Sequence, residues 1–175
     1  YGKQTMFWAD IIMKHPESVD MLSKELTVLI WGYEDDHPFE RECEKIASRG
    51  LPFYVCPGTS SWNSITGRLT NATKNLSRAA LNGITFGGKG YLITDWGDHG
   101  HHQYLPISFG GLTLGACSAW HHKASKFIDL SDAIHKIWLP EHLKASQLLV
   151  TLGSIPDKID CDIRNGTIFN HLLFW

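Results

Sequence analysis

The sequence lacks a long hydrophobic run and an excess of charge of either sign. Its apolar stretches are far shorter than the roughly 20 residues that a membrane-spanning helix needs. The formal net charge is −2 and the pI is about 6.6, so neither nucleic acid nor a membrane surface is expected as a partner. No secretory signal is visible at Tyr1, which slightly favours a cytoplasmic over a secreted protein.

Cysteine is present without a recognisable pattern. The four cysteines have neither a CxxC pair nor a histidine at close ligand spacing, as zinc sites and disulfide frameworks require. They are Cys43, Cys56, Cys117 and Cys161. We therefore expect buried thiols, no metal site and no cofactor.

Tryptophan and histidine, in contrast, are abundant, with seven and ten residues. Four of the tryptophans stand beside polar clusters instead of inside apolar runs: Trp8, Trp31, Trp62 and Trp96. A single indole at such a place could equally pack in a core. Four of them at similar places indicate a concave aromatic pocket, which suits flat, weakly polar ligands such as sugar rings.

Residues 90–106 form the most informative segment of the chain. The apolar residues 91–94 have the length and composition of a strand, and they run directly into a polar rim of acids, imidazoles and one indole at 95–102. Ligand sites of parallel α/β folds lie where strands end in this way. The alternative is a polar surface turn without a ligand. It is disfavoured because three upstream segments also have an apolar strand that ends in a polar cluster.

Apolar runs and helical segments alternate along residues 1–123. Strands are predicted at 5–8, 26–31, 51–56 and 91–94, and helices at 39–48, 68–82 and 108–120, the second of them closed by Gly83. This alternation is typical of βα units on a parallel sheet. A (β/α)8 TIM barrel needs about 200 residues or more, so four units predict the C-terminal half of one.

The remaining region, 124–175, has helical periodicity and no cluster of residues that could form a catalytic or binding site. A helix is expected over 128–138, capped by Asp129 or Ser131, and another is expected after Pro140. We interpret this region as a structural helical appendage.

At three predicted strand ends, an aromatic residue and a polar residue stand two positions apart. The pairs are Trp8 with Asp10, Trp31 with Tyr33, and Trp96 with Asp98. On an extended segment such residues point to the same side, so each pair could stack a sugar ring and bind its hydroxyls. Asp95 is expected to point the other way and to hold the loop.

Other chemistries stay open on the residues alone. A two-carboxylate glycosidase pair could be drawn from Asp10, Glu34, Asp35 and Asp98. The histidines of 99–102, with His121 and His122, invite a metal interpretation, but no recognised ligand spacing is present. A serine nucleophile within 59–61 is less favoured still, since the GxSxG elbow is lacking.

Four motifs, in this order, carry a resemblance to a known family. They are Phe7-Trp8-Ala9-Asp10, Trp31-Gly32-Tyr33-Glu34, the segment 57–64 and the segment 94–101. Together they resemble the last four strand ends of a β-N-acetylhexosaminidase of glycoside hydrolase family 20, in its bacterial subgroup with a helical C-terminal domain. The segments at 152–153 and 165–167 are similar to that domain, so the resemblance spans nearly the whole chain.

The resemblance implies retaining hydrolysis of terminal β-linked GlcNAc or GalNAc, in which the substrate's acetamido oxygen attacks the anomeric carbon. Tyr33 is the candidate donor to that acetamide. The family's catalytic Asp-Glu pair belongs upstream of Tyr1, and no adjacent Asp-Glu occurs in this chain. The implied substrate-binding residues are Trp8, Asp10, Trp31, Tyr33, Trp62, Trp96 and Asp98.

Two positions depart from the family's pattern. The family more often has glutamate where this chain has Asp98, and the tyrosine of its seventh strand is not plainly present. Tyr33 or Trp62 is the candidate to take the place of that tyrosine.

We therefore expect the complete protein to be a β-N-acetylhexosaminidase and residues 1–175 alone to be inactive. The expected partner is the upstream half of the barrel or a second copy, because half a barrel has unpaired strand edges. A non-catalytic carbohydrate-binding half-barrel is the alternative, and a metal-dependent hydrolase is a more distant one.

Overall fold

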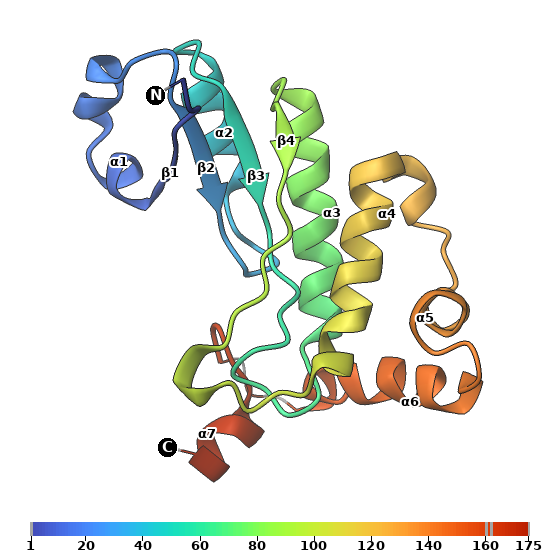
Figure 1. The fold of residues 1–175 in the computed structure, drawn as a ribbon. Helices are drawn as coiled ribbons and strands as arrows, with labels where there is room; N and C mark the ends of the chain where they lie inside the picture. Colours follow the sequence, from blue (N-terminus) through green and yellow to red (C-terminus); the bar gives the residue numbers. More distant parts are fainter. Residues whose placement is uncertain (1, 160, 162, 175) are drawn as a thin grey trace.

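The computed structural model describes residues 2–159, 161 and 163–174 (Figure 1). Tyr1, Asp160, Asp162 and Trp175, the last residue of the predicted tail, lie outside this part of the chain. Four parallel strands form one sheet in the order β1-β2-β3-β4, which confirms the α/β class and the parallel sheet. The strands are β1 (Met6–Trp8), β2 (Thr27–Trp31), β3 (Phe53–Cys56) and β4 (Gly90–Tyr91).

Helices follow each strand and then make up the tail. Those between and after the strands are α1 (Asp10–Lys14), η1 (Pro16–Met21), α2 (Phe39–Ala47), α3 (Leu69–Thr85), η2 (Asp98–Gly100), η3 (Leu105–Ser108) and α4 (Phe109–Ser125). The tail contains α5 (Leu130–Trp138), α6 (Leu143–Gly153), η4 (Pro156–Lys158) and α7 (Ile168–Phe174). Among the described residues, none of these helices is long and apolar enough to cross a membrane.

Successive helices pack on successive strands of the sheet. Helix α2 packs on β2 and β3, α3 packs on β3 and β4, and α4 packs on α3 (Figure 1). The main core lies between these helices and the sheet, where Val28 and Ile30 of β2 are fully buried with Ile46 of α2. A parallel strand that is buried on both faces has a continuous run of apolar residues in its sequence. This run is why β2 could be predicted.

The prediction that Gly83 closes the helix at 68–82 is wrong, because this helix, α3, continues to Thr85. A Cβ atom at residue 83 would lie 3.0 Å from the Val55 Cγ2 atom of β3. The glycine therefore allows close packing of helix and strand, and it does not terminate the helix. The predicted strand over 91–94 is also shorter than expected, since the ladder ends at Tyr91 and only an isolated bridge joins Thr94 to Gly58.

The helix expected over 108–120 is α4, which extends to Ser125. Its small residues make close contacts with the segment after β3, since a Cβ at Gly111 would lie 2.6 Å from the Cα of Thr59. Helix α5 begins at a cap formed by Asp129, whose side chain accepts a hydrogen bond from the backbone N–H of Asp132 at 3.1 Å. The division of the chain into domains at residue 123 stays a prediction.

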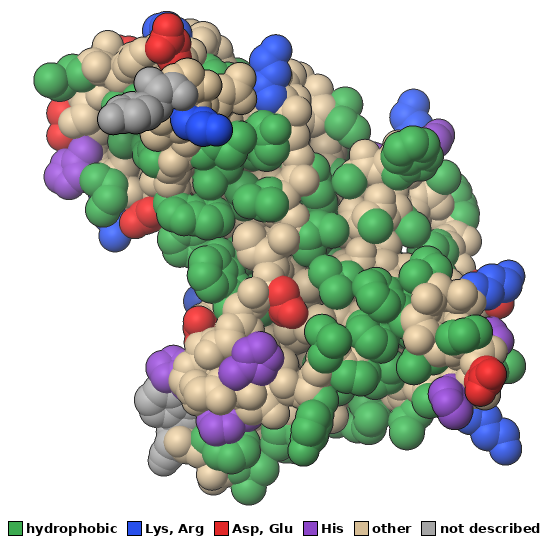
Figure 2. Space-filling view, viewed as in Figure 1, with side chains coloured by type: hydrophobic (Ala, Val, Ile, Leu, Met, Phe, Trp, Pro, Cys, Tyr) green, Lys and Arg blue, Asp and Glu red, His purple; other side chains and the backbone are tan. Residues whose placement is uncertain are grey.

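Hydrophobic side chains gather over the strands and over α4 on the face of the molecule seen in Figure 2. The two outer strands, β1 and β4, each have one strand neighbour among the described residues. Met6 of β1 is 43% exposed and Leu92, directly after β4, is 40% exposed. Apolar surface on the outer strands of a parallel sheet is unusual, because such strands are normally covered on both faces.

Candidate functional site

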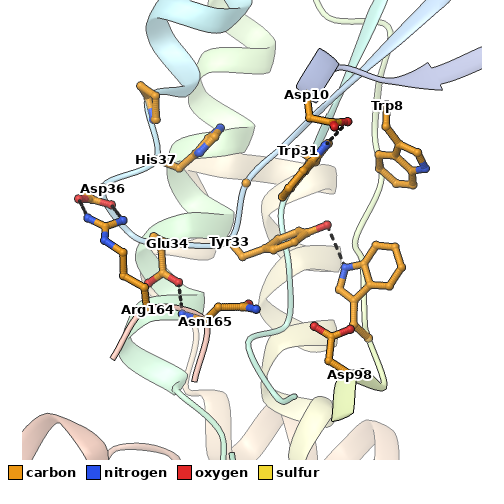
Figure 3. Close-up of a pocket in the computed structure, with 13 residues that line it drawn as sticks. Trp8, Asp10, Trp31, Tyr33, Glu34, Asp36, His37, Asp98, Arg164 and Asn165 are labelled. Atoms are coloured by element: carbon orange, nitrogen blue, oxygen red, sulfur yellow. Dashed lines mark hydrogen bonds and ion pairs between the residues drawn. The ribbon is translucent and has the colours of Figure 1, made fainter. Parts of the chain in front are cut away.

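A cavity of about 850 Å³ opens at the carboxyl ends of β1 and β2, beside the segment that follows β4 (Figure 3). Six of the seven residues predicted to bind substrate line it: Trp8, Asp10, Trp31, Tyr33, Trp96 and Asp98. The other lining residues are Gly32, Glu34, Asp36, His37, Pro38, Arg164 and Asn165. The carboxyl ends of neighbouring parallel strands thus bring together residues that are up to 90 positions apart in the sequence.

Three indoles and one phenol form an aromatic wall. The ring centroids of Trp8 and Trp96 are 6.1 Å apart, and those of Trp31 and Tyr33 are 5.2 Å apart. Tyr33 also lies 6.4 Å from Trp96, with an angle of 59° between the ring planes. These spacings are those of aromatic rings in contact. The four rings therefore form one continuous apolar surface along the cavity, which suits a flat, weakly polar ligand.

Hydrogen bonds between the lining residues orient the polar atoms of the aromatic wall. The indole N–H of Trp96 donates to the Tyr33 hydroxyl oxygen at 2.9 Å, and the indole N–H of Trp31 donates to Asp10 Oδ1 at 3.4 Å. Burial, the largest cause, raises the pKa of Tyr33 above its ordinary value of 10.0. The phenol therefore keeps its proton at neutral pH, as a hydrogen-bond donor to a ligand must.

The prediction that paired residues two positions apart face the same side agrees with the structure for all three pairs, since both members of each pair line the cavity. For two of the pairs the reason differs from the one given above. Asp10 begins α1 and Ala9 before it has helical angles, and Asp98 begins the short 3₁₀ helix η2, so neither pair lies on an extended segment.

Trp62 lies apart from the other predicted residues. It is 2% exposed and does not line the cavity. Its ring meets the ring of Tyr33 edge-on at 5.0 Å and 85°, and a Cβ at Gly58 would lie only 2.4 Å from its Cη2 atom. In the structure Trp62 supports Tyr33 from behind, at a place where glycine leaves room for the indole.

The loop that carries Tyr33 is held by two asparagines of α3. Asn75 is fully buried: its Nδ2 donates to the carbonyl oxygens of Gly32 and Glu34, and its Oδ1 accepts from the N–H of Gly58. Asn71, one turn earlier, donates to the carbonyl oxygen of Tyr33 at 2.6 Å. Residues four apart share one helix face, so a single face of α3 positions the loop.

Three consecutive acidic residues follow Tyr33, and each pairs with a different cation. Glu34 pairs with Arg68 directly before α3, Asp35 with Lys74 of α3, and Asp36 with Arg164 of the tail. Hydrogen bonding by Arg164, the largest cause, lowers the pKa of Asp36 below its ordinary value. These carboxylates are therefore engaged in structural ion pairs.

Arg164 and Asn165 were not anticipated, because the tail was interpreted as purely structural. The N–H of Asn165 donates to Glu34 Oε1 at 2.7 Å, and its Oδ1 accepts from the indole N–H of Trp62 at 2.7 Å. The sequence does carry a turn signal here, the Asn165-Gly166 dipeptide, and Asn165 has a φ of 57°. A turn signal does not tell which distant loop the turn will contact.

Asp95 holds the loop after β4, as predicted. Its Oδ1 accepts from Ser61 Oγ at 2.6 Å and from Thr59 Oγ1, and its Oδ2 accepts from Ser108 Oγ at 2.8 Å. Asp95 thus engages two hydroxyls of the segment 59–61, where a serine nucleophile was considered, and the third, Ser60 Oγ, accepts from Asn71 Nδ2 at 2.8 Å.

The histidines after β4 take separate places. His99 and His101 have positive φ angles of 53° and 58°, and His102 stacks on Phe174 of α7 with centroids 4.1 Å apart. Within the described part of the chain, no group of three or more His, Cys, Asp and Glu side chains is placed to hold a metal ion.

No family model matches this sequence, and no curated protein matches it.

Proposed function

We propose that this chain is the C-terminal half of a (β/α)8 barrel. The strand order β1-β2-β3-β4 supports this, because every strand pairs with the next one in the chain. In doubly wound sheets, the main alternative for parallel strands, the strand order reverses at a switch point. The stepwise packing of α2 and α3 on successive strands supports the same architecture, and the exposed apolar residues of β1 and β4 fit a sheet that continues into a further half.

We further propose that the complete protein is a glycosidase that removes terminal β-linked N-acetylhexosamine. The observation that carries this proposal is the aromatic cavity with Asp10 and Asp98 at its polar margin. Indoles pack on the apolar faces of sugar rings, and carboxylates accept hydrogen bonds from sugar hydroxyls. Within this proposal the acetamido group lies among the indoles, and the Tyr33 hydroxyl donates to its oxygen.

The proposed reaction uses the substrate's own acetamide. Its carbonyl oxygen forms a bond to the anomeric carbon while the glycosidic bond breaks, and water then opens the cyclic intermediate with net retention. The resemblance implies that the leaving oxygen takes a proton from the Glu of the family's Asp-Glu pair, which is expected upstream, since residues 1–175 have no adjacent Asp-Glu. Tyr33 would orient the acetamide oxygen toward the anomeric carbon.

A second candidate function is a carbohydrate-binding half-barrel without catalysis. The observation that favours it is the engagement of nearby carboxylates: Glu34 and Asp36 are in ion pairs, and Asp95 accepts from three hydroxyls. Such a protein would bind the same sugar and release nothing. The two candidates therefore differ in turnover and not in affinity.

Purified residues 1–175 are expected to release no 4-nitrophenol from its β-N-acetylglucosaminide above background. Without a proton donor the reaction forfeits the ~10²–10⁴-fold that general acid catalysis contributes. The same assay with a separately produced upstream half should restore turnover if the halves dock.

Two results would count against this account. Turnover by residues 1–175 alone would place the acid within this chain. Absence of turnover in the complete protein, with the sugar still bound, would favour the non-catalytic candidate.

A further inference from the structure

The imidazole of His37 lines the cavity next to the aromatic wall, and in Figure 3 it stands on the other side of Trp31 from Trp8. His37 lies four residues after Tyr33, in the loop between β2 and α2. Its side chain is only 19% exposed, so most of its surface is packed against neighbouring groups. The proposed reaction assigns no step to this imidazole, and its role must come from these contacts.

Two residues of α2 fix the orientation of the ring. The Nε2 atom lies 3.0 Å from Glu42 Oε2, and the Glu42 side chain is only 13% exposed. A carboxylate accepts hydrogen bonds, so the imidazole carries a proton on Nε2 and donates it to Glu42. The ring of Phe39, which is 1% exposed, meets the imidazole edge-on with centroids 4.6 Å apart and 71° between the planes. The imidazole can therefore leave its place only by giving up both contacts.

One face of the imidazole rests on the backbone of Gly32. A Cβ atom at residue 32 would lie 2.2 Å from both Cγ and Nδ1 of His37 and 2.3 Å from Cδ2. These distances are far below the roughly 3.5–4.0 Å at which carbon atoms make contact. Glycine at this position therefore allows the ring to lie directly on the main chain.

The sheet and α3 hold Gly32 from other directions. Its N–H donates to the Cys56 carbonyl oxygen at 3.4 Å, at the end of the β2–β3 ladder, and its carbonyl oxygen accepts from Asn75 Nδ2 at 2.9 Å. Gly32 is also the residue between Trp31 and Tyr33, whose rings are 5.2 Å apart and tilted by 30°. Because the main chain is held between these partners and the imidazole, the two side chains leave it in fixed directions.

We infer that His37 is a positioning residue for the aromatic wall. Its imidazole, held by Glu42, fixes the main chain at Gly32, and this segment sets the directions of the two flanking rings. The inference rests on the proposed function, in which the acetamido group lies among the indoles and Tyr33 donates to its oxygen. Loss of the imidazole should therefore weaken recognition of the acetamido group. Glucose has no such group, so its affinity should depend little on His37.

The test is fluorescence titration of the full chain with N-acetylglucosamine and with glucose. His37→Ala is expected to lower the affinity for N-acetylglucosamine about tenfold and the affinity for glucose by less than about twofold. Glu42→Ala should have the same selective effect, and Glu42→Gln should keep most of the affinity, because its amide oxygen still accepts from Nε2. His15→Ala is the matched control, since His15 also pairs with a glutamate, Glu17, but is exposed and does not line the cavity.

A double-mutant cycle tests the contact with Gly32 itself. Gly32→Ala places a methyl group where the imidazole lies, and it is expected to lower the affinity for N-acetylglucosamine by about tenfold or more. In the His37→Ala background the same methyl group enters the vacated space, so the double variant should bind within about twofold of His37→Ala. Independent residues would instead multiply their losses to about a hundredfold. Near-UV circular dichroism of the unliganded proteins follows the aromatic rings without any sugar and should show the same non-additive pattern.

Equal losses for the two sugars in His37→Ala, or multiplied losses in the cycle, would overturn the inference and leave the proposed function standing. If the unsubstituted chain did not bind N-acetylglucosamine, the proposed function would fail, and circular dichroism would still decide the inference. Unchanged spectra in His37→Ala and Gly32→Ala would then overturn it. If Gly32→Ala alone did not fold, folding of the double variant would support the contact, and failure of both to fold would contradict it.

Discussion

Replacing Asp98 by alanine in the complete protein is expected to lower kcat/KM for a β-linked N-acetylglucosaminide by ~10²-fold or more. Asp98 lines the cavity beside Trp96, where its carboxylate can accept from sugar hydroxyls. A hydrogen bond to a charged group contributes roughly 1.5–3 kcal/mol, and one that strengthens in the transition state contributes more. The measurement is steady-state kinetics on the nitrophenyl substrate.

Two control variants make this result specific. Asp98→Glu keeps the carboxylate and introduces the residue more common in the family that the sequence resembles, so it is expected to retain most of the activity. Asp132→Ala removes an exposed carboxylate of α5 that pairs with Lys136, and it should leave the kinetics unchanged. Wild-type kinetics in Asp98→Ala would remove this residue from the proposed site.

Asn75→Ala is expected to lower the free energy of unfolding of the full chain by roughly 3–5 kcal/mol. The substitution leaves three backbone groups without their partner: the carbonyls of Gly32 and Glu34 and the N–H of Gly58. Each buried polar group that loses its hydrogen bond costs about 1–3 kcal/mol, and neighbouring losses do not add fully. Urea denaturation followed by circular dichroism measures the change.

Asn82→Ala on the same helix is the matched control. Among the described residues, the Asn82 side chain donates to the carbonyl oxygen of Arg78 within α3 alone, so its loss should change the free energy of unfolding by less than about 1 kcal/mol. If both variants unfolded at the same urea concentration, the Tyr33 loop would not depend on Asn75. The packing account of that loop would then need revision.

The sequence predicted the sheet and the six cavity residues for one physical reason. In a parallel sheet every carboxyl end lies at the same edge, so a polar residue directly after an apolar run can be placed without knowing the rest of the fold. Trp31 and Tyr33 were found in this way, as were Trp96 and Asp98. The same reasoning could not distinguish Trp62 from the tryptophans that line the cavity. A tryptophan after a strand gives the same sequence pattern whether it lines a cavity or packs behind the residues that do.

The contribution of the tail could not be predicted from the same pattern. Arg164 and Asn165 reach the loop after β2 across about 130 positions, and these contacts depend on how α5 and α6 pack against α4 and α3. Gly83 shows a related limit. Glycine ends helices and also permits close packing, and only the position of Val55 decides between these two effects.

The most direct test of the central claim is whether the cavity recognises an acetamido sugar. The full chain is titrated with N-acetylglucosamine and with glucose, and tryptophan fluorescence is followed because three indoles line the cavity. N-acetylglucosamine is expected to bind saturably and at least about tenfold more tightly than glucose, and Tyr33→Phe should reduce that preference. Equal affinity for the two sugars, or no saturable change with N-acetylglucosamine, would contradict the account.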